Sequence, residues 1–446
     1  MEINRFIETL FARAAEAGYE ASEAYYASGE SFQVSVKGGE IIDYSVSSSI
    51  GLSFRALVDG KMGYASTQVL DDEAIDLLID GAGSNARMIE NDDEEFIFEG
   101  SESYAEMDVY NPAVDQVTAA EKIAMAKELE KKVLEKDSAI KQVQMVRVLT
   151  MGGERRIVNS KGLDVSFRDN GIGAVAIAIA ADGGKVAVGV GHKVVRQPEE
   201  LDLDEIASRA VKDAVSGLHA EPVASGTYSV VLRNDVMSSM LGCFDSVFSA
   251  DQAQKGLSLL KGREGEEIAS PVLTLIDDPL DVKALSAKPF DDEGVATARR
   301  EIVKEGKLMT LFHNLKTARK QGVQSTGHAS KASYASPVGV APINFYVKPG
   351  DADLDELCRQ MGNGLLISDV EGLHSGANQI SGDFSLGARG YLVEDGKVTS
   401  AVNQITIAGN FFELLKTITA VGSDLENMSS VASPSVLVSK ISIAGK

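Results

Sequence analysis

The chain has 446 residues, of which 44% are hydrophobic and 24% charged, and its formal net charge is −23. This length is enough for two or three domains, and the composition is ordinary for a globular protein. The acidic balance, without a basic cluster interleaved with aromatics, argues against a nucleic-acid partner, because such binding relies on Lys and Arg contacts to phosphates.

The apolar runs, the first residues and the cysteine content do not indicate a membrane protein or an oxidising compartment. No stretch of about 18 apolar residues is free of charge, so we expect no membrane span and no membrane partner. The start, Met1-Glu2-Ile3-Asn4, lacks the basic-then-apolar layout of a signal peptide. Cys243 and Cys358 are the only cysteines and give no disulfide framework. We therefore expect a cytoplasmic protein in a reducing compartment.

The first half of the chain predicts helices alternating with short strands. Apolar residues keep helical spacing from Ile3 to Ala17, and Gly18 ends the run. Asp59-Gly60 is a hairpin turn signal. Short strands are expected at residues 24–27, 32–37, 40–47, 51–57 and 62–66. Further helices are expected at residues 72–88 and 114–135, separated by an acidic, turn-rich stretch at 90–111.

Two segments of this half resemble each other. Residues 48–63 and residues 170–185 both run as a strand, an Asp-Gly turn and a lysine, and each is followed by an amphipathic helix. The pattern predicts a duplicated helix–sheet unit over about residues 1–218.

The second half is richer in predicted strands. They are expected at residues 228–232, 272–276, 343–347, 364–370, 402–407 and 436–443, with hairpins at 302–310 and 392–399. Helices are expected at residues 235–248, 353–361 and 411–419. A boundary near Ala220-Glu221-Pro222 divides the chain into an N-terminal α+β domain, 1–220, and a larger β-rich C-terminal domain, 221–446. The predicted fold class is α+β.

The residue types that hold metals or act as nucleophiles are sparse. No two of the five histidines are closer than 15 residues, so no pair shares one helical face, although ligands from distant loops remain an alternative. Cys243 and Cys358 each lie in an apolar helical pattern, which favours a core cysteine over a nucleophile.

Two motifs resemble the TldD/TldE (PmbA) family of gyrase-modulator peptidases. One is Phe290-Asp291-Asp292-Glu293-Gly294, and the other runs from Ile380-Ser381-Gly382-Asp383-Phe384-Ser385 to Ile407-Ala408-Gly409-Asn410. The zinc branch of that family carries H-E-x-x-x-H on a central helix. The matching segment here, residues 235–245, has no such motif, and no cysteine follows Cys358. The chain therefore resembles the TldE/PmbA branch.

The resemblance implies a subunit of a cytoplasmic metallopeptidase complex that degrades or matures unfolded peptides. The resemblance implies a TldD-like zinc subunit as partner. The chain is expected to form a homo-dimer or a hetero-dimer, with subunit contacts largely from the C-terminal domain. Zinc is expected in the TldD-like partner. This chain is expected to hold no cofactor or metal and to have no catalytic residues of its own. One alternative is an independent homo-oligomeric peptide-binding scaffold without proteolysis, and another is an enzyme with an unrecognised metal site.

The two motifs also supply the candidate peptide-binding residues. The resemblance places Asp292, Glu293 and Gly294 at the edge of a peptide cleft, and the alternative is a solvated turn before residues 295–298. The candidate groove further contains Ser381, Gly382, Asp383, Phe384 and Ser385. An extended peptide would pair with an exposed strand edge there, and an ordinary sheet strand is the alternative.

Overall fold

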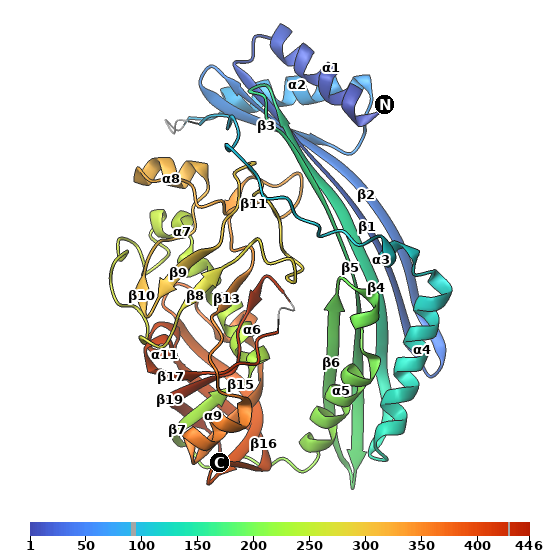
Figure 1. Cartoon of the computed structure of the whole chain (residues 1–446), viewed down its shortest axis with the longest axis vertical. Helices are drawn as coiled ribbons and strands as arrows, with labels where there is room; N and C mark the ends of the chain where they lie inside the picture. Colours follow the sequence, from blue (N-terminus) through green and yellow to red (C-terminus); the bar gives the residue numbers. More distant parts are fainter. Residues whose placement is uncertain (91–94, 427–428) are drawn as a thin grey trace.

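The structure is a computed structural model, and it describes residues 1–90, 95–426 and 429–446. Residues 91–94 of the predicted acidic stretch lie outside the described residues. Figure 1 shows two bodies side by side: a long curved sheet with helices on its outer face, and a more compact β-rich body. The chain passes from the first body to the second after residue 217 and before residue 226.

The N-terminal body is one six-stranded antiparallel sheet in the order β3-β2-β1-β4-β5-β6. Its strands are β1 (Ala21–Lys37), β2 (Glu40–Val58), β3 (Lys61–Thr67), β4 (Ile140–Asn159), β5 (Asp164–Asp182) and β6 (Lys185–Val195). Its helices are α1 (Ile3–Glu16), α2 (Asp72–Arg87), α3 (Pro112–Gln116), α4 (Ala119–Lys136) and α5 (Leu203–Gly217), with a 3-10 turn at Pro198–Glu200.

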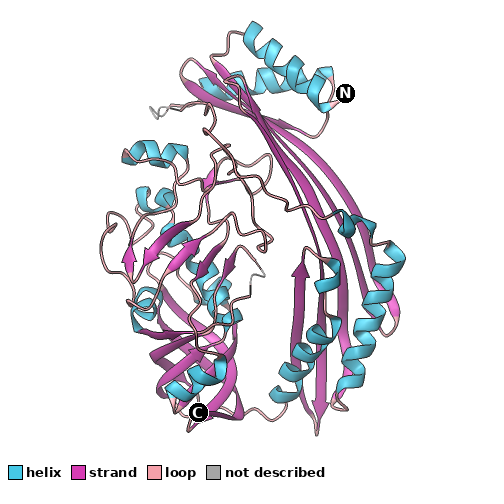
Figure 2. Ribbon diagram, viewed as in Figure 1, coloured by secondary structure: helices cyan, strands magenta, loops and turns pink. Residues whose placement is uncertain are grey.

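The sheet is built from two copies of one unit. The order helix, three strands, helix occurs first as α1-β1-β2-β3-α2 and again as α4-β4-β5-β6-α5. The two units meet at the antiparallel pair β1–β4, and their helix pairs cover opposite ends of the sheet (Figures 1 and 2). Each pair buries its own apolar core, around Phe6 and Leu10 in the first unit and around Ala126 and Leu129 in the second. This topology agrees with the predicted duplication.

The strands are much longer than the sequence predicts. Residues 24–27 and 32–37 belong to one continuous strand, β1, and residues 40–47 and 51–57 belong to β2. The intervening segments, Ser28–Ser31 and Ser48–Ile50, consist mainly of serine and glycine, yet they belong to the paired region of the two strands. Sheet pairing here outweighs the weak strand preference of glycine and serine.

Other local predictions are confirmed or adjusted. The Asp59-Gly60 turn has φ values of 51° and 73°, as a two-residue hairpin of this type requires. The helix predicted at 114–135 is divided into α3 and α4, because Thr118 begins α4 with a capping box closed by Glu121.

The C-terminal body is organised around a second six-stranded sheet, in the order β16-β15-β14-β7-β19-β17. Its strands are β7 (Gly226–Leu232), β14 (Gly364–Glu371), β15 (Asp383–Glu394), β16 (Lys397–Asn410), β17 (Ile418–Val421) and β19 (Val436–Ala444). An additional pairing between β16 and β19 closes five of these strands into a ring. The α+β fold class predicted from the sequence is confirmed.

Short elements complete this body. A smaller sheet has the order β10-β9-β8-β13-β18, with β8 (Leu275–Asp277), β9 (Arg300–Lys304), β10 (Lys307–Leu308), β13 (Phe345–Val347) and β18 (Val431–Ala432). A two-stranded ladder joins β11 (Ala329–Ser330) and β12 (Gly339–Val340). The helices are α6 (Asn234–Phe244), α7 (Ala250–Gln254), α8 (Leu315–Gln321), α9 (Leu354–Met361), α10 (Leu373–Gly376) and α11 (Phe411–Thr417), and a 3-10 turn covers Asp245–Phe248.

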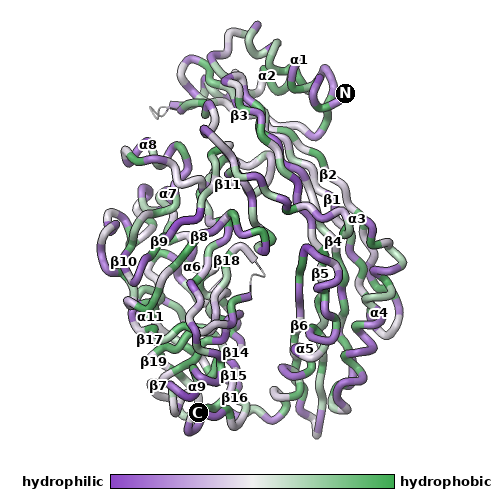
Figure 3. The backbone as a smooth tube through the Cα atoms, in the orientation of Figure 1, coloured by the Kyte–Doolittle hydropathy of each residue, from purple (hydrophilic) through white to green (hydrophobic). Residues whose placement is uncertain are grey.

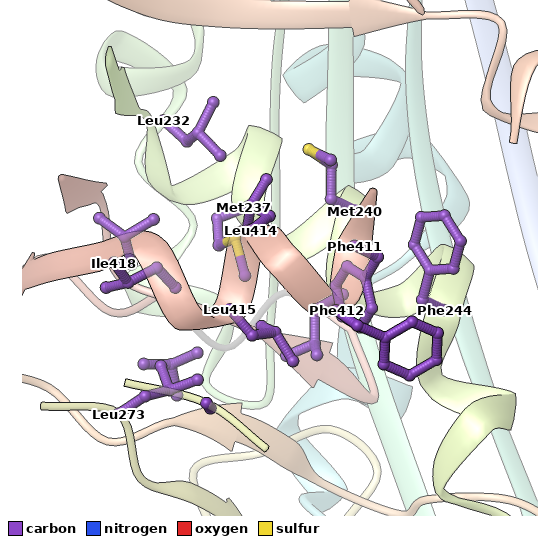
Figure 4. Packing of buried hydrophobic residues seen from close by; sticks show 14 of the residues in the cluster. Leu232, Met237, Met240, Phe244, Leu273, Phe411, Phe412, Leu414, Leu415 and Ile418 are labelled. Atoms are coloured by element: carbon purple, nitrogen blue, oxygen red, sulfur yellow. The ribbon is translucent and has the colours of Figure 1, made fainter. Parts of the chain in front are cut away.

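Helices α6 and α11 fill the core of this body. Phe244 of α6 stacks on Phe411 of α11 with ring centroids 4.5 Å apart. Met237 and Met240 belong to the same buried cluster as the leucines of α11 (Figure 4). These side chains are fully or almost fully buried, so the position of α6 is fixed by its apolar face. The backbone coloured by hydropathy shows apolar and polar residues interspersed along both bodies (Figure 3).

Candidate functional site

Three adjoining cavities lie over the polar face of α6, and we call them together the α6 cleft. Their volumes are about 1140, 360 and 210 Å³. Ser239 lines all three, and His192 and Asp235 line the two smaller ones. His192 belongs to β6 of the N-terminal body, so both bodies contribute to the wall.

The amphipathic pattern of α6 explains why it presents this face. Its apolar residues point into the C-terminal core, and those that are buried are Val236, Met237, Met240, Leu241 and Phe244. The opposite side carries small or polar residues, so no bulky side chain fills the space over the helix. Apart from Val236, the cleft-lining residues of α6 are Asp235, Ser238, Ser239, Gly242 and Cys243.

A network of ion pairs crosses the cleft wall between the two bodies. Arg233, just before α6, donates to both oxygens of Asp235 and to both oxygens of Asp213 on α5. Arg209 of α5 contacts Asp235 at 3.0 Å and Glu426 at 3.1 Å. Burial favours the neutral form of Asp235, but the hydrogen bonds and charge of Arg233 outweigh it and hold the pKa below its ordinary value.

A second contact across the wall involves Arg389 of β15. Its guanidinium pairs with Asp369 at 2.7 Å and donates to the backbone oxygen of Val188 in β6 at 2.8 Å. The charges of the wall are thus largely compensated by their neighbours.

Burial is the largest influence on the pKa of two other titratable groups in the cleft. Burial raises the pKa of Asp245 to about 6, and the backbone N–H of Ser246 offsets this only in part. Burial, and then the positive charge of Arg209, lower the pKa of His192. Asp245 therefore changes its charge near neutral pH, whereas His192 is a neutral ring there.

The cysteines differ from each other in their surroundings. Cys243 is half-buried, lines the largest cavity and packs partly against the main core. Its Sγ lies 3.9 Å from the Leu373 carbonyl oxygen, and burial raises its pKa, which disfavours the reactive thiolate. Cys358 is buried in a small separate cluster, and burial raises its pKa to about 11. The core interpretation thus holds fully for Cys358 and in part for Cys243.

Of the candidate groove residues Ser381–Ser385, the last three line the α6 cleft and the first two do not. Asp383, Phe384 and Ser385 line the largest cavity of the α6 cleft, together with residues 373–380. Ser381 donates to Asp383, and Gly382 has φ of 83° with the Phe412 ring 2.7 Å from where a Cβ would lie. Ser381 and Gly382 thus shape the turn that enters β15.

The expectation of an exposed strand edge at this motif is wrong. Residues 383–386 pair with β16 on one side. On the other side Ala377 bridges to Phe384, and Asn378 donates to the Asp383 carbonyl. Phe384 is itself 4% exposed and belongs to the core. The preceding loop folds back onto the strand and covers the edge that a peptide would need.

The first predicted motif forms a buried contact between the two bodies, which we call the domain junction. Asp291 is 0% exposed, and Glu293 is almost as deeply buried. Arg55 of β2 donates to Glu23 of β1 at 2.7 Å and to Glu293 at 3.5 Å, while Tyr25 of β1 donates to Asp292 at 3.1 Å. The interpretation of this motif as a solvated turn is therefore wrong.

The junction is separate from the α6 cleft. Glu293 lines a small cavity of about 180 Å³ with Arg55 and Tyr64, and neither Asp292 nor Gly294 lines any of the three cleft cavities. Gly294 has φ of 81°, and a Cβ there would lie 2.5 Å from Leu163 Cδ2. The motif thus joins the bodies closely, and the structure does not bring its residues into one cavity with Asp383, Phe384 and Ser385.

Most residues of the cleft wall were not singled out from the sequence. Arg209 and Asp213 lie four residues apart on α5, whereas Arg389 and Asp369 come from β15 and β14, and no spacing in the sequence relates these three elements. One signal was available at Arg233-Asn234-Asp235, where three polar residues interrupt two apolar runs. Such a polar start is typical of a helix N-terminus, where polar side chains accept hydrogen bonds from free backbone N–H groups.

The donor set around α6 does not fit a zinc ion. Both oxygens of Asp235 are engaged by arginines, and the thiol of Cys243 is held protonated. Throughout the described residues, no three His, Cys, Asp or Glu side chains are grouped closely enough to hold a metal.

Family models match most of the chain. The models of PmbA/TldA metallopeptidase domain 1, central domain and C-terminal domain match residues 22–86, 112–218 and 225–445. A protein of Escherichia coli O157:H7 named Metalloprotease PmbA is 27% identical over 420 residues, which cover 93% of this chain and 90% of that relative. Within the residues that the structure describes, no helix has the length and apolar character needed to cross a membrane.

Solved structures show the same relationship. A candidate modulator of a DNA gyrase from Thermotoga maritima MSB8 is 36% identical, with a TM-score of 0.93 over 99% of this chain and 100% of that chain. TldE from Thermococcus kodakarensis is 22% identical, with a TM-score of 0.91 over 99% of this chain and 100% of that chain, and shows a shared fold. The chain therefore belongs to the PmbA/TldD family of metalloprotease-like proteins.

Proposed function

We propose that this chain is the non-catalytic subunit of a cytoplasmic metallopeptidase complex, and that it holds unfolded peptide in the α6 cleft. The zinc and the hydrolytic chemistry would come from a TldD-like partner subunit. The observation that carries the proposal is that the polar face of α6 lines the cleft. The segment that corresponds to the zinc helix of the family's zinc branch lines the cleft here with Asp235, Ser238, Ser239 and Gly242, which offer no zinc site.

The cleft has features that suit an extended peptide. The largest cavity, about 1140 Å³, is an open hollow that fits a few residues of extended chain and excludes a folded domain. Its lining mixes apolar side chains such as Leu373 and Ile380 with the polar Asn378 and Gln379. The arginines and carboxylates of the adjoining wall neutralise one another, so the wall favours no particular charge on the peptide. Such a lining supports tolerance of many sequences.

The carboxyl group of Asp245 gives the cleft one group that titrates near neutral pH. A lone carboxyl can bind a peptide N–H or an ammonium group when ionised. By itself it does not hydrolyse an amide, because that reaction needs an activated water or nucleophile as well.

Ser239 offers a direct test of the cleft. Its side chain is exposed and lines all three cavities, so Ser239→Tyr should fill the cleft without disturbing the core. Ser208→Tyr on α5 is the matched control, because Ser208 is also exposed on a helix and lines none of the three cavities. With a TldD-like zinc subunit present, we expect Ser239→Tyr to lower the cleavage rate of an unfolded peptide by about tenfold and Ser208→Tyr to leave it unchanged.

The second candidate, a peptide-binding scaffold without proteolysis, makes a different prediction. It shares the cleft but needs no zinc subunit, so peptide binding would be detected and cleavage would proceed at one rate with and without this chain. Elemental analysis that finds about one zinc per isolated chain, lost on chelation together with a peptidase activity, would contradict both candidates.

A further inference from the structure

Asp245 lies in the α6 cleft without a cation beside it. It ends α6 and begins the 3-10 turn Asp245–Phe248, and its half-buried side chain lines the cavity of about 360 Å³. Within the described part of the chain its carboxyl group has no ion pair, and the donor that it does have is the backbone N–H of Ser246. The negative charge of Asp245 is therefore left open to whatever enters this cavity.

The other carboxylates of the two smaller cavities are each held by an arginine. The pairs are Arg233–Asp235, Arg233–Asp213, Arg209–Glu426 and Arg389–Asp369, with N···O distances of 2.7, 3.2, 3.1 and 2.7 Å. In the largest cavity Asp383 is exposed, and its oxygens accept hydrogen bonds from the side chains of Ser381 and Asn410. Asp245 differs from all of these, because it is half-buried and neither a cation nor a side-chain donor among the described residues offsets its charge.

The space in front of Asp245 is kept open by small residues of α6. Gly242 and Ser238 precede Asp245 by one and two helical turns, so they lie on the same face of the helix, and all three line one cavity. Ser239 lines this cavity and also the largest one, so the two cavities adjoin. A peptide that lies in the largest cavity can therefore extend one end toward Asp245.

An ammonium group is the chemical partner that this position lacks. Half-burial removes part of the hydration of an ionised carboxylate, and a charge-assisted hydrogen bond from a bound ammonium offsets that loss. Asp245 also stands at the carbonyl end of α6, which carries partial negative charge and favours a cation. The carboxyl terminus of a peptide would be repelled at the same place, so the cleft distinguishes the two ends of a peptide.

The α-ammonium group is the cation that unfolded peptides share whatever their sequence, whereas lysine and arginine occur only in some of them. It therefore suits a cleft whose wall favours no particular side chain. We propose that Asp245 binds the α-ammonium group of a peptide and so fixes the N-terminus of the peptide at the end of α6. This inference rests on the proposed function and adds to it a direction for the bound chain and a requirement for a free N-terminus.

The proposal is tested by the binding of a short fluorescent peptide to the isolated full-length chain, measured by fluorescence anisotropy. At about pH 7 the carboxyl group of Asp245, with its pKa of about 6, is ionised, and a peptide α-amino group, with a pKa of about 8, is protonated. The peptide contains no Lys, Arg or His, carries the dye on its amidated C-terminus, and is used with a free or an acetylated N-terminus. We expect the free peptide to bind about tenfold more tightly than the acetylated one.

One variant and a matched control assign this preference to Asp245. Asp245→Asn keeps the size of the side chain and removes its charge, so it should bind the free peptide only as well as the acetylated one. Asp355→Asn is the control, because Asp355 is exposed on α9 and lines none of the three cavities. It should retain the preference, and a preference that survives in Asp245→Asn overturns the inference.

The remaining outcomes separate this inference from the proposed function. Equal binding of the free and acetylated peptides by the wild-type protein overturns the inference and leaves the proposed function standing. Failure of both peptides to bind contradicts the proposed function, and the inference with it. An acetylated peptide with one internal lysine identifies the source of the cation, and it should bind as weakly as the acetylated peptide without lysine. A gain from the lysine that Asp245→Asn abolishes would assign Asp245 to a side chain and overturn the assignment to the N-terminus.

Discussion

The two bodies of this protein meet in two places that differ in character. At the domain junction the contact is closed: Glu23, Arg55 and Glu293 form a buried row of charges, and Asp291 is fully buried beside them. At the α6 cleft the same two bodies stand apart around three cavities and are joined by half-buried ion pairs such as Arg209–Asp235.

The contrast between the closed domain junction and the open α6 cleft shows how two bodies can keep a cleft of fixed width between them. Buried charges cost free energy unless each is paired, so the junction tolerates only one arrangement of its three residues. The ion pairs of the cleft remain partly in water and tolerate small displacements. We infer that the junction sets the relative position of the bodies, and that the width of the cleft follows from it.

The largest effect is expected when the charge row of the junction is broken. Arg55→Met leaves the buried carboxylates of Glu23 and Glu293 without the guanidinium that pairs with both of them. The free energy of unfolding should fall by about 3–5 kcal/mol, measured by denaturant titration. Arg13→Met removes an exposed arginine that pairs with Asp72 and Asp76, and it should cost about 1 kcal/mol or less.

A triple variant sharpens this test. Replacing Glu23 and Glu293 by Gln together with Arg55→Met removes all three charges, so it should be less destabilised than Arg55→Met alone. Equal losses in the single and triple variants would show that packing, and not charge pairing, stabilises the junction.

The sequence predicted the local elements better than the contacts between them. Helix α1 and the Asp59-Gly60 turn follow from residues that are neighbours in the chain, and both were predicted. The burial of Glu293 depends on Arg55, which lies 238 residues away, so the residues of the motif alone also allowed a solvated turn. The coverage of Phe384 by Ala377 depends on how a loop folds back, and no periodicity reports that.

The closed ring of strands in the C-terminal body was unpredictable for the same reason. Its closing pair, β16–β19, matches Thr406 with Ala444 across one helix and two short strands. Whether a strand edge is exposed depends on the completed sheet. The residues of the strand near Ser381–Leu386 therefore could not show that the preceding loop covers its edge.

An intermediate effect is expected from the carboxyl group of Asp245 in the cleft. Its pKa is about 6 in the folded protein and about 3.9 in an unfolded chain, so the folded state holds a proton that the unfolded state has lost. Stability from this group is therefore present at low pH and declines as the pH rises from about 4 to about 6. Asp245→Asn should gain about 1–2 kcal/mol over wild type at neutral pH, with little difference at pH 4.

Asp235, in the same cleft, has its pKa shifted in the opposite direction from that of Asp245. Its pKa is held below the ordinary value by Arg233, so its contribution is present at neutral pH and is lost as the pH falls below about 4. Asp235→Asn should therefore destabilise the protein at neutral pH. A gain in stability for Asp235→Asn, or a loss for Asp245→Asn, would show that the charges of the cleft wall are not arranged as described.

The smallest effect is expected from a single hydrogen bond at the junction. The Tyr25 hydroxyl donates to Asp292 at 3.1 Å, and Tyr25→Phe removes that bond while keeping the ring beneath the Lys331 ammonium. Asp292 keeps the backbone N–H of Lys331 as a donor, so the free energy of unfolding should fall by only about 1 kcal/mol. Tyr228→Phe is the control, because its hydroxyl donates to Ala224 at an exposed site within the C-terminal body and should cost less. If Asp292 instead faced solvent in a turn, the two variants would be indistinguishable, and the closed junction that separates this contact from the cleft would have to be abandoned.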